Sequence, residues 1–143
     1  MKKTIIFILC VVITITAIFY SKYLDYKVKA NEIKENNLEY ETYLNKKIYG
    51  TELTTVINKA VDNNEKNNIQ KDTKGFYIQN DTNSIKLEIK ITDNEKIYQM
   101  ETIYGGGMTE FVTYYNSIYF ECTKLSYNSE GRVNYMLFEQ IST

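Results

Sequence analysis

The sequence predicts an α+β protein in which an N-terminal transmembrane helix continues as a stalk and leads to one small domain. Three observations predict this class. An uncharged apolar run covers residues 4–21, residues 51–61 carry an apolar stripe at helical spacing, and residues 84–92 alternate between apolar and polar side chains. A chain of 143 residues leaves room for a single domain after such a helix. We expect a helix packed on a roughly five-stranded, mostly antiparallel sheet.

The apolar run of residues 4–21 follows two lysines and would be about 27 Å long as a helix, which is close to the thickness of a membrane's hydrocarbon core. We therefore expect residues 1–21 to be an uncleaved signal-anchor. A cleaved signal peptide is the alternative, but the run ends with the bulky Phe19 and Tyr20, where a cleavage site requires small residues.

The charges beside the apolar run help to predict on which side of the membrane the C-terminal domain lies. Four lysines follow it between residues 22 and 34, and the positive-inside rule alone would place the following domain in the cytoplasm. The charged start, however, resembles an export signal, and Asp25, Glu32 and Glu35 are mixed with those lysines. We expect a single-pass protein of the bacterial cell membrane whose C-terminal domain is extracytoplasmic.

Residues 22–47 contain neither glycine nor proline and are predicted to continue the helix as a stalk until Gly50 stops it. Apolar and aromatic side chains recur along it at heptad spacing, which is typical of helices that self-associate. The candidate self-association positions are Tyr26, Ile33, Asn37, Tyr40 and Leu44. A buried asparagine such as Asn37 fixes the register of a parallel dimer. Alternatively, this stripe packs against the chain's own domain.

The domain is predicted to cover residues 48–143 and to begin with an amphipathic helix in which Thr51 is the N-cap. Five apolar side chains share one face of that helix: Leu53, Val56, Ile57, Ala60 and Val61. The polar residues 62–68 that follow are expected to form an exposed loop.

The rest of the domain is predicted to be mainly strands. Strands are expected at residues 76–79, 84–92, 96–103, 118–125 and 132–141, with a short helix at residues 109–115. In the second of these strands, isoleucine and leucine alternate with lysine and glutamate, which predicts one face in the core and one face in water.

Several segments carry a resemblance to a known family. They are Gly50-Thr51-Glu52-Leu53, Ile57-Asn58-Lys59-Ala60 and Asp62-Asn63-Asn64-Glu65-Lys66-Asn67. These segments resemble a box found in small single-span membrane proteins of low-GC Gram-positive bacteria, and the resemblance continues through residues 120–124 and 135–139. That family carries no assigned activity. The layout is also similar to type IV pilins, but only in architecture, because residues 4–21 lack the early glutamate that pilins carry.

Composition argues against most enzymes and against nucleic-acid binding. Histidine is absent, and 17 basic and 18 acidic residues are interleaved without a basic stripe. Cys122 shares a strand face with Ile118 and Phe120, which predicts a buried thiol and not a nucleophile. We expect no catalytic residue, no cofactor and no metal. An envelope enzyme that uses carboxylates alone is the alternative, and its candidates are Glu101, Glu110, Glu121 and Glu139.

Tyrosine is unusually abundant, with 14 residues, and it gathers near a triple glycine that is expected to reverse the chain with positive φ. The candidate interaction surface comprises Tyr104, Gly105, Gly106, Gly107, Tyr114, Tyr115 and Tyr119. Tyrosine is enriched in binding surfaces, although it is also the half-buried aromatic residue of small sheets. The sequence thus predicts a membrane-anchored, non-catalytic interaction or assembly module with a protein partner. A pilin-like subunit that self-associates through its N-terminal helix is the alternative.

Overall fold

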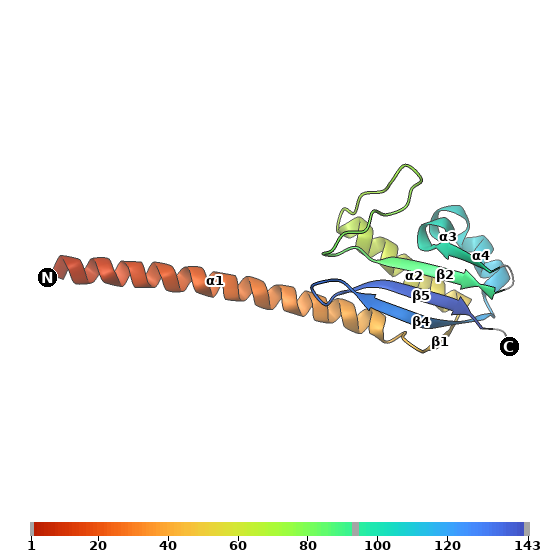
Figure 1. The fold of residues 1–143 in the computed structure, drawn as a ribbon, viewed down its shortest axis with the longest axis horizontal. Coiled ribbons are helices and arrows are strands. Elements are labelled where there is room, and N and C mark those ends of the chain that lie inside the picture. Colours follow the sequence, from red (N-terminus) through yellow and green to blue (C-terminus); the bar gives the residue numbers. More distant parts are fainter. Residues whose placement is uncertain (1, 93–94, 142–143) are drawn as a thin grey trace. The chain divides into compact units, whose positions relative to one another are not determined.

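The computed structural model describes residues 2–92 and 95–141 (Figure 1). The chain divides into two compact units, residues 1–35 and residues 36–143, and each is described by itself. Helix α1 (Lys2–Glu41) supplies the described part of the first unit and the start of the second. Among the described residues, α1 is the one helix long and apolar enough to span a membrane.

The apolar part of α1 has side chains suited to lipid. Ile6, Phe7 and Leu9 are 61%, 69% and 59% exposed, a continuous apolar surface that water does not favour. Two polar side chains in this run are satisfied inside the helix: the hydroxyls of Thr14 and Thr16 each donate a 2.8 Å hydrogen bond to the carbonyl four residues earlier.

The second unit is an α+β domain built on one five-stranded sheet. Its elements after α1 are β1 (Lys47–Tyr49), α2 (Gly50–Lys66), β2 (Lys86–Ile91), β3 (Lys96–Gln99), α3 (Met100–Gly106), α4 (Met108–Tyr115), β4 (Tyr119–Tyr127) and β5 (Val133–Gln140). The strands lie in the order β1-β4-β5-β2-β3. The predicted α+β class is therefore confirmed.

The sheet is mixed, which corrects the expected mostly antiparallel sheet. Neighbouring hairpin strands β2 and β3, and β4 and β5, pair antiparallel, as does β1 with β4. At the centre, however, β5 pairs parallel with β2, with Leu87 opposite Met136 and Ile89 opposite Phe138. The chain crosses from β3 to β4 through α3 and α4, and this crossing allows β5 to lie beside β2 in the same direction.

Two predicted strands differ from the structure. Residues 76–79 form no strand and contribute only an isolated bridge between Lys71 and Tyr77. The predicted third strand stops at Gln99, and residues 100–103 begin α3. The fifth strand is instead β1, whose three residues were too short to stand out between two helices.

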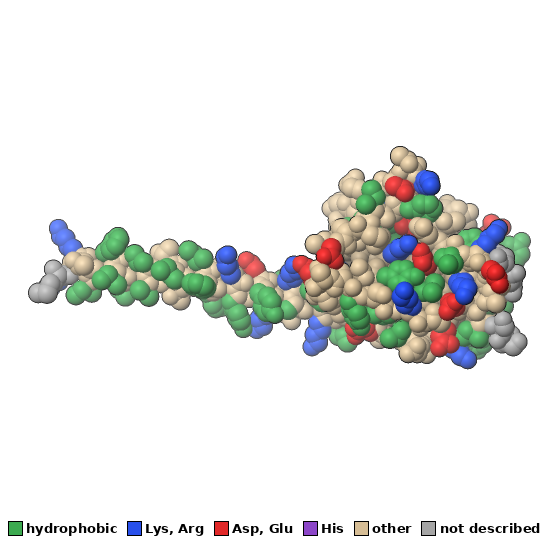
Figure 2. Space-filling model, viewed as in Figure 1, with side chains coloured by type: hydrophobic (Ala, Val, Ile, Leu, Met, Phe, Trp, Pro, Cys, Tyr) green, Lys and Arg blue, Asp and Glu red, His purple; other side chains and the backbone are tan. Residues whose placement is uncertain are grey.

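The core lies between the sheet and α2, as predicted. All five side chains of the α2 stripe are at most 1% exposed, and Leu87, Ile89 and Ile91 of β2 face them from the sheet. The opposite face of the sheet carries compact ion pairs, such as Lys90 with Glu139 at 2.8 Å. Figure 2 shows acidic and basic side chains interspersed over the domain, which suits a face in water.

The junction between the helices departs from the predicted stalk. Helix α1 ends at Glu41, before Gly50, and Tyr40 near its end is 1% exposed within the domain core. Helix α2 then begins at Gly50 with Tyr49 as its N-cap, so the predicted Thr51 cap is wrong. Strand pairing of β1 with β4 fixes this start, because it holds Tyr49 in an extended conformation.

The polar residues 62–68 correct another prediction. They are not an exposed loop, because α2 continues to Lys66 and Asn64 is fully buried. The Asn64 amide receives a 2.8 Å hydrogen bond from the backbone N–H of Ile85 and donates one of 2.8 Å to the Ile85 carbonyl. The Asn64 side chain therefore satisfies both backbone groups of the residue just before β2, as a neighbouring strand would.

Candidate binding site

The structure divides the predicted tyrosine and glycine surface among three places. Gly106, Gly107, Tyr114 and Tyr115 line one pocket, here called the tyrosine pocket. Tyr104 and Gly105 line a second, here called the Glu101 pocket. Tyr119 lines neither of these two pockets. The two pockets lie on either side of α3 and share the lining residue Thr102.

The tyrosine pocket has a volume of about 350 Å³. Its lining comes from the ends of β2 and β3 and from α3 and α4: Ile91, Tyr98, Thr102, Ile103, Gly106, Gly107, Glu110, Phe111, Tyr114 and Tyr115. Phe111 and Tyr115 lie 4.9 Å apart between ring centroids, and both rings reach Phe120 in the core. Tyr114 is 69% exposed, so the pocket combines an anchored aromatic floor with an accessible aromatic rim.

Close packing at Gly50 holds α4, and with it this floor, in place. A Cβ atom at Gly50 would lie 2.0 Å from the Tyr115 carbonyl oxygen, a distance that only glycine permits. The Gly50 N–H also donates a 3.0 Å hydrogen bond to the carbonyl of Ile118. The first residue of α2 thus fixes the last turn of α4.

The triple glycine plays a different part from the one predicted. Gly105 and Gly106 end α3, Gly107 is the N-cap of α4, and none of the three has φ in the left-handed region. The expected reversal with positive φ is therefore wrong. Two short helices meet here, and glycine keeps side chains out of the pocket wall between them.

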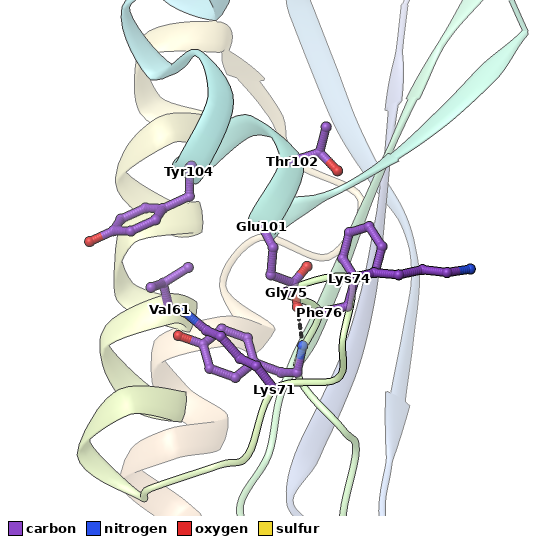
Figure 3. Close-up of a pocket in the computed structure, with 10 residues that line it drawn as sticks. Val61, Lys71, Lys74, Gly75, Phe76, Glu101, Thr102 and Tyr104 are labelled. Carbon is purple, nitrogen blue, oxygen red and sulfur yellow. Dashed lines mark hydrogen bonds between the residues drawn. The ribbon is translucent and has the colours of Figure 1, made fainter.

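The Glu101 pocket lies between α2, α3 and the loop that joins α2 to β2, and its volume is about 300 Å³. Figure 3 shows Glu101 extending from α3 into the centre of the view, with Tyr104 and Val61 to one side. Glu101 Oε1 accepts a 3.0 Å hydrogen bond from the Tyr77 N–H, whereas Oε2 is buried without a hydrogen-bond partner among the described residues.

Tyr119 belongs to the β1 edge of the sheet. Its ring stacks on that of Tyr49 with centroids 4.4 Å apart, and the two hydroxyls are 2.5 Å apart. The hydrogen bond with Tyr49 raises the pKa of Tyr119. This pair ties the short β1 to β4 and leaves Tyr49 46% exposed.

The candidate self-association positions fall in both units. Tyr26, which is 73% exposed, and Ile33 belong to the first unit. Asn37 belongs to the second, where its Oδ1 accepts a 2.8 Å hydrogen bond from the Val133 N–H and its Nδ2 donates one of 2.8 Å to the Gly131 carbonyl.

The side chains of Asn37 and Tyr40 contact the chain's own domain. Tyr40 is in the core, where burial raises its pKa. Leu44 bridges to Cys122 and lies beyond the end of α1.

Two of the groups that could carry chemistry are kept protonated or paired with a lysine. Cys122 is fully buried, and desolvation raises the pKa of its thiol to about 11, so it is protonated at neutral pH. Glu121 and Glu139 face each other across β4 and β5, but Lys90 pairs with Glu139 and lowers its pKa. Within residues 2–92 and 95–141, no group of three or more acidic or cysteine side chains could hold a metal ion.

Sequence reasoning did not place Phe111 and Tyr98 in the lining of the tyrosine pocket, and it did not find the position of Glu101. Phe111 lies on the apolar side of the predicted residue 109–115 helix, so its spacing could have indicated burial. From the sequence, Glu101 is only one of four candidate carboxylates of an enzyme. Its hydrogen bond with the Tyr77 N–H has no sequence signal, because Tyr77 lies in an irregular loop.

Comparison with protein-family models, with curated proteins and with solved structures finds no match to this chain. The resemblance to small single-span membrane proteins therefore stays a prediction.

Proposed function

We propose that this protein is a membrane-anchored, non-catalytic binding module whose extracytoplasmic domain recognises a protein partner through the tyrosine pocket. Helix α1, long and apolar enough to span a membrane, supports the anchor. The observation that carries the proposal is the tyrosine pocket itself, which is open to a partner at Tyr114 and lined with aromatic rings.

The size and chemistry of the tyrosine pocket define what it accepts. A volume of about 350 Å³ fits one or two side chains and not a whole helix. Buried aromatic and aliphatic anchors supply most of the binding energy at protein interfaces. Glu110 lines the pocket and can accept a hydrogen bond from the partner segment that carries the anchor side chain. The proposed occupant is therefore an apolar anchor side chain presented by another envelope protein.

A photoreactive residue tests this assignment in cells. With p-benzoylphenylalanine at position 114, ultraviolet light is expected to crosslink the full-length protein to one discrete partner, because this position lies at the open rim of the tyrosine pocket. Mass spectrometry of the adduct would identify the partner and the residue inserted.

Tyr127 provides a matched control. It is a tyrosine with 50% exposure on β4, outside both pockets, where its hydroxyl donates a 2.9 Å hydrogen bond to Glu41. The same photoreactive residue at position 127 should not give that adduct. Equal crosslinking from both positions, or none from position 114, would contradict the proposal.

A further inference from the structure

We propose that the Glu101 pocket is a second binding site, specific for an organic cation: a primary ammonium or a guanidinium group. This inference goes beyond the proposed function because it concerns a different pocket and does not depend on the partner of the tyrosine pocket. Three features carry it: an incompletely paired carboxylate, aromatic walls, and an ammonium group already held on one of those walls.

The carboxylate of Glu101 is the first feature. One oxygen is fixed by the Tyr77 N–H at 3.0 Å, while the other is shielded from solvent and has no hydrogen-bond partner among the described residues. A buried acceptor without a donor is unfavourable, and a charged donor satisfies it best. The carboxylate is thus oriented by its first oxygen, and its second oxygen lacks a donor.

Aromatic side chains are the second feature. Phe76, Tyr77 and Tyr104 contribute to the pocket lining, and Val61 adds an apolar surface from α2. Aromatic faces attract cations through the ring quadrupole. A carboxylate among aromatic rings favours an organic cation with an alkyl stem over a small hydrated metal ion.

Lys71 supplies the third feature. Its ammonium nitrogen lies 4.5 Å from the centroid of the Tyr77 ring and 3.8 Å from Glu65 Oε1. The pocket wall therefore already holds one ammonium group between a ring and a carboxylate. Lys74, the other lysine of the lining, extends away from Glu101 in Figure 3 and leaves the central charge to that carboxylate.

A loop with little regular structure forms the wall that shields Glu101. Between the end of α2 and the start of β2, the described chain has only the isolated Lys71–Tyr77 bridge as regular pairing. Gly75 in this loop has a φ of 86° and an open surrounding. A cation that displaces this loop slightly would reach Glu101 Oε2 and replace the missing donor.

Titration of the full-length protein in detergent micelles, followed at the Tyr77 amide by NMR, tests the site. The probes are putrescine, a capped Ala-Lys-Ala peptide, and the same peptide with uncharged norleucine in place of lysine. We expect the cations to bind and the norleucine peptide not to bind. Binding of putrescine alone would identify a free amine as the ligand source, and binding of the lysine peptide a protein side chain.

Substitutions define the groups involved. Glu101→Gln keeps the acceptor for the Tyr77 N–H and removes the charge, and it should weaken cation binding about tenfold or more. Lys71→Met removes a competing ammonium and should strengthen binding about two- to fivefold. Glu52→Gln, at a carboxylate of α2 outside both pockets, should change nothing.

Two results would overturn the cation site. One is equal binding of the lysine and norleucine peptides, which would show an apolar pocket only. The other is unchanged cation affinity in Glu101→Gln while the protein remains folded. Neither result affects the crosslink from position 114, so the cation site and the tyrosine pocket are tested independently.

Discussion

Replacing Asn64 by leucine is expected to lower the free energy of unfolding by about 3–5 kcal/mol. Asn64 is fully buried, and its amide satisfies both the N–H and the carbonyl of Ile85. Leucine of similar size would leave both backbone groups buried without a partner. Chemical denaturation of the full-length protein in detergent micelles, followed by near-ultraviolet circular dichroism, measures the change.

Asn58 is the matched control for this substitution. It lies on the same helix, α2, but is exposed to solvent. Asn58→Leu should change the free energy of unfolding by less than about 0.5 kcal/mol. A small effect at position 64, comparable to that at position 58, would show that Asn64 does not hold β2 to α2.

Gly50→Ala is expected to lower the free energy of unfolding by about 3 kcal/mol. The added methyl group would lie 2.0 Å from the Tyr115 carbonyl oxygen and 2.7 Å from its carbonyl carbon, and neither backbone atom can move without α4. Because α4 carries Tyr114, the same substitution should also remove the position-114 crosslink. Denaturation as above and the crosslinking yield measure the two effects.

Gly105→Ala tests whether the effect is steric. Gly105 is helical, and a Cβ atom there would meet no heavy atom within 4 Å. Alanine should therefore be neutral or stabilise the protein by up to about 1 kcal/mol, because it reduces the entropy of the unfolded chain. Equal destabilisation at positions 50 and 105 would contradict the packing described for Gly50.

The sequence predicted those parts of the fold that follow from local periodicity. The α2 stripe and the alternation in β2 each have one clear period, and both are buried as expected. Strand order and direction depend on contacts between distant segments. The parallel pairing of β5 with β2 therefore had no local signal.

Asparagines that bind the backbone explain other differences. Asn64 looks like a loop residue because its side chain is polar, yet it is buried where it completes the hydrogen bonds of Ile85. Asn37 occupies a heptad position that is typical of a dimer seam, yet it binds Val133 and Gly131. In both places, sequence shows the side chain's polarity and only the fold shows its partners.

The sequence grouped the tyrosines and glycines of the candidate surface, but it did not show how the fold distributes them. Tyr114 and Tyr115, two residues of the predicted surface, line one pocket. Tyr104 and Tyr119 were grouped with them by sequence proximity, but α3 directs Tyr104 to the Glu101 pocket and β4 places Tyr119 against Tyr49. Turns between short helices set these directions, and their geometry does not follow from residue types.

The central claim, a membrane-anchored domain outside the cytoplasm, is tested most directly by labelling intact cells with a membrane-impermeant amine reagent. Mass spectrometry of the membrane fraction should find label on the exposed domain lysines Lys47 and Lys74 and none on Lys2 and Lys3 before lysis. Label on Lys2 and Lys3 alone in intact cells would place the domain in the cytoplasm. Recovery of the domain from the medium without the α1 segment would show a cleaved signal and contradict the anchor.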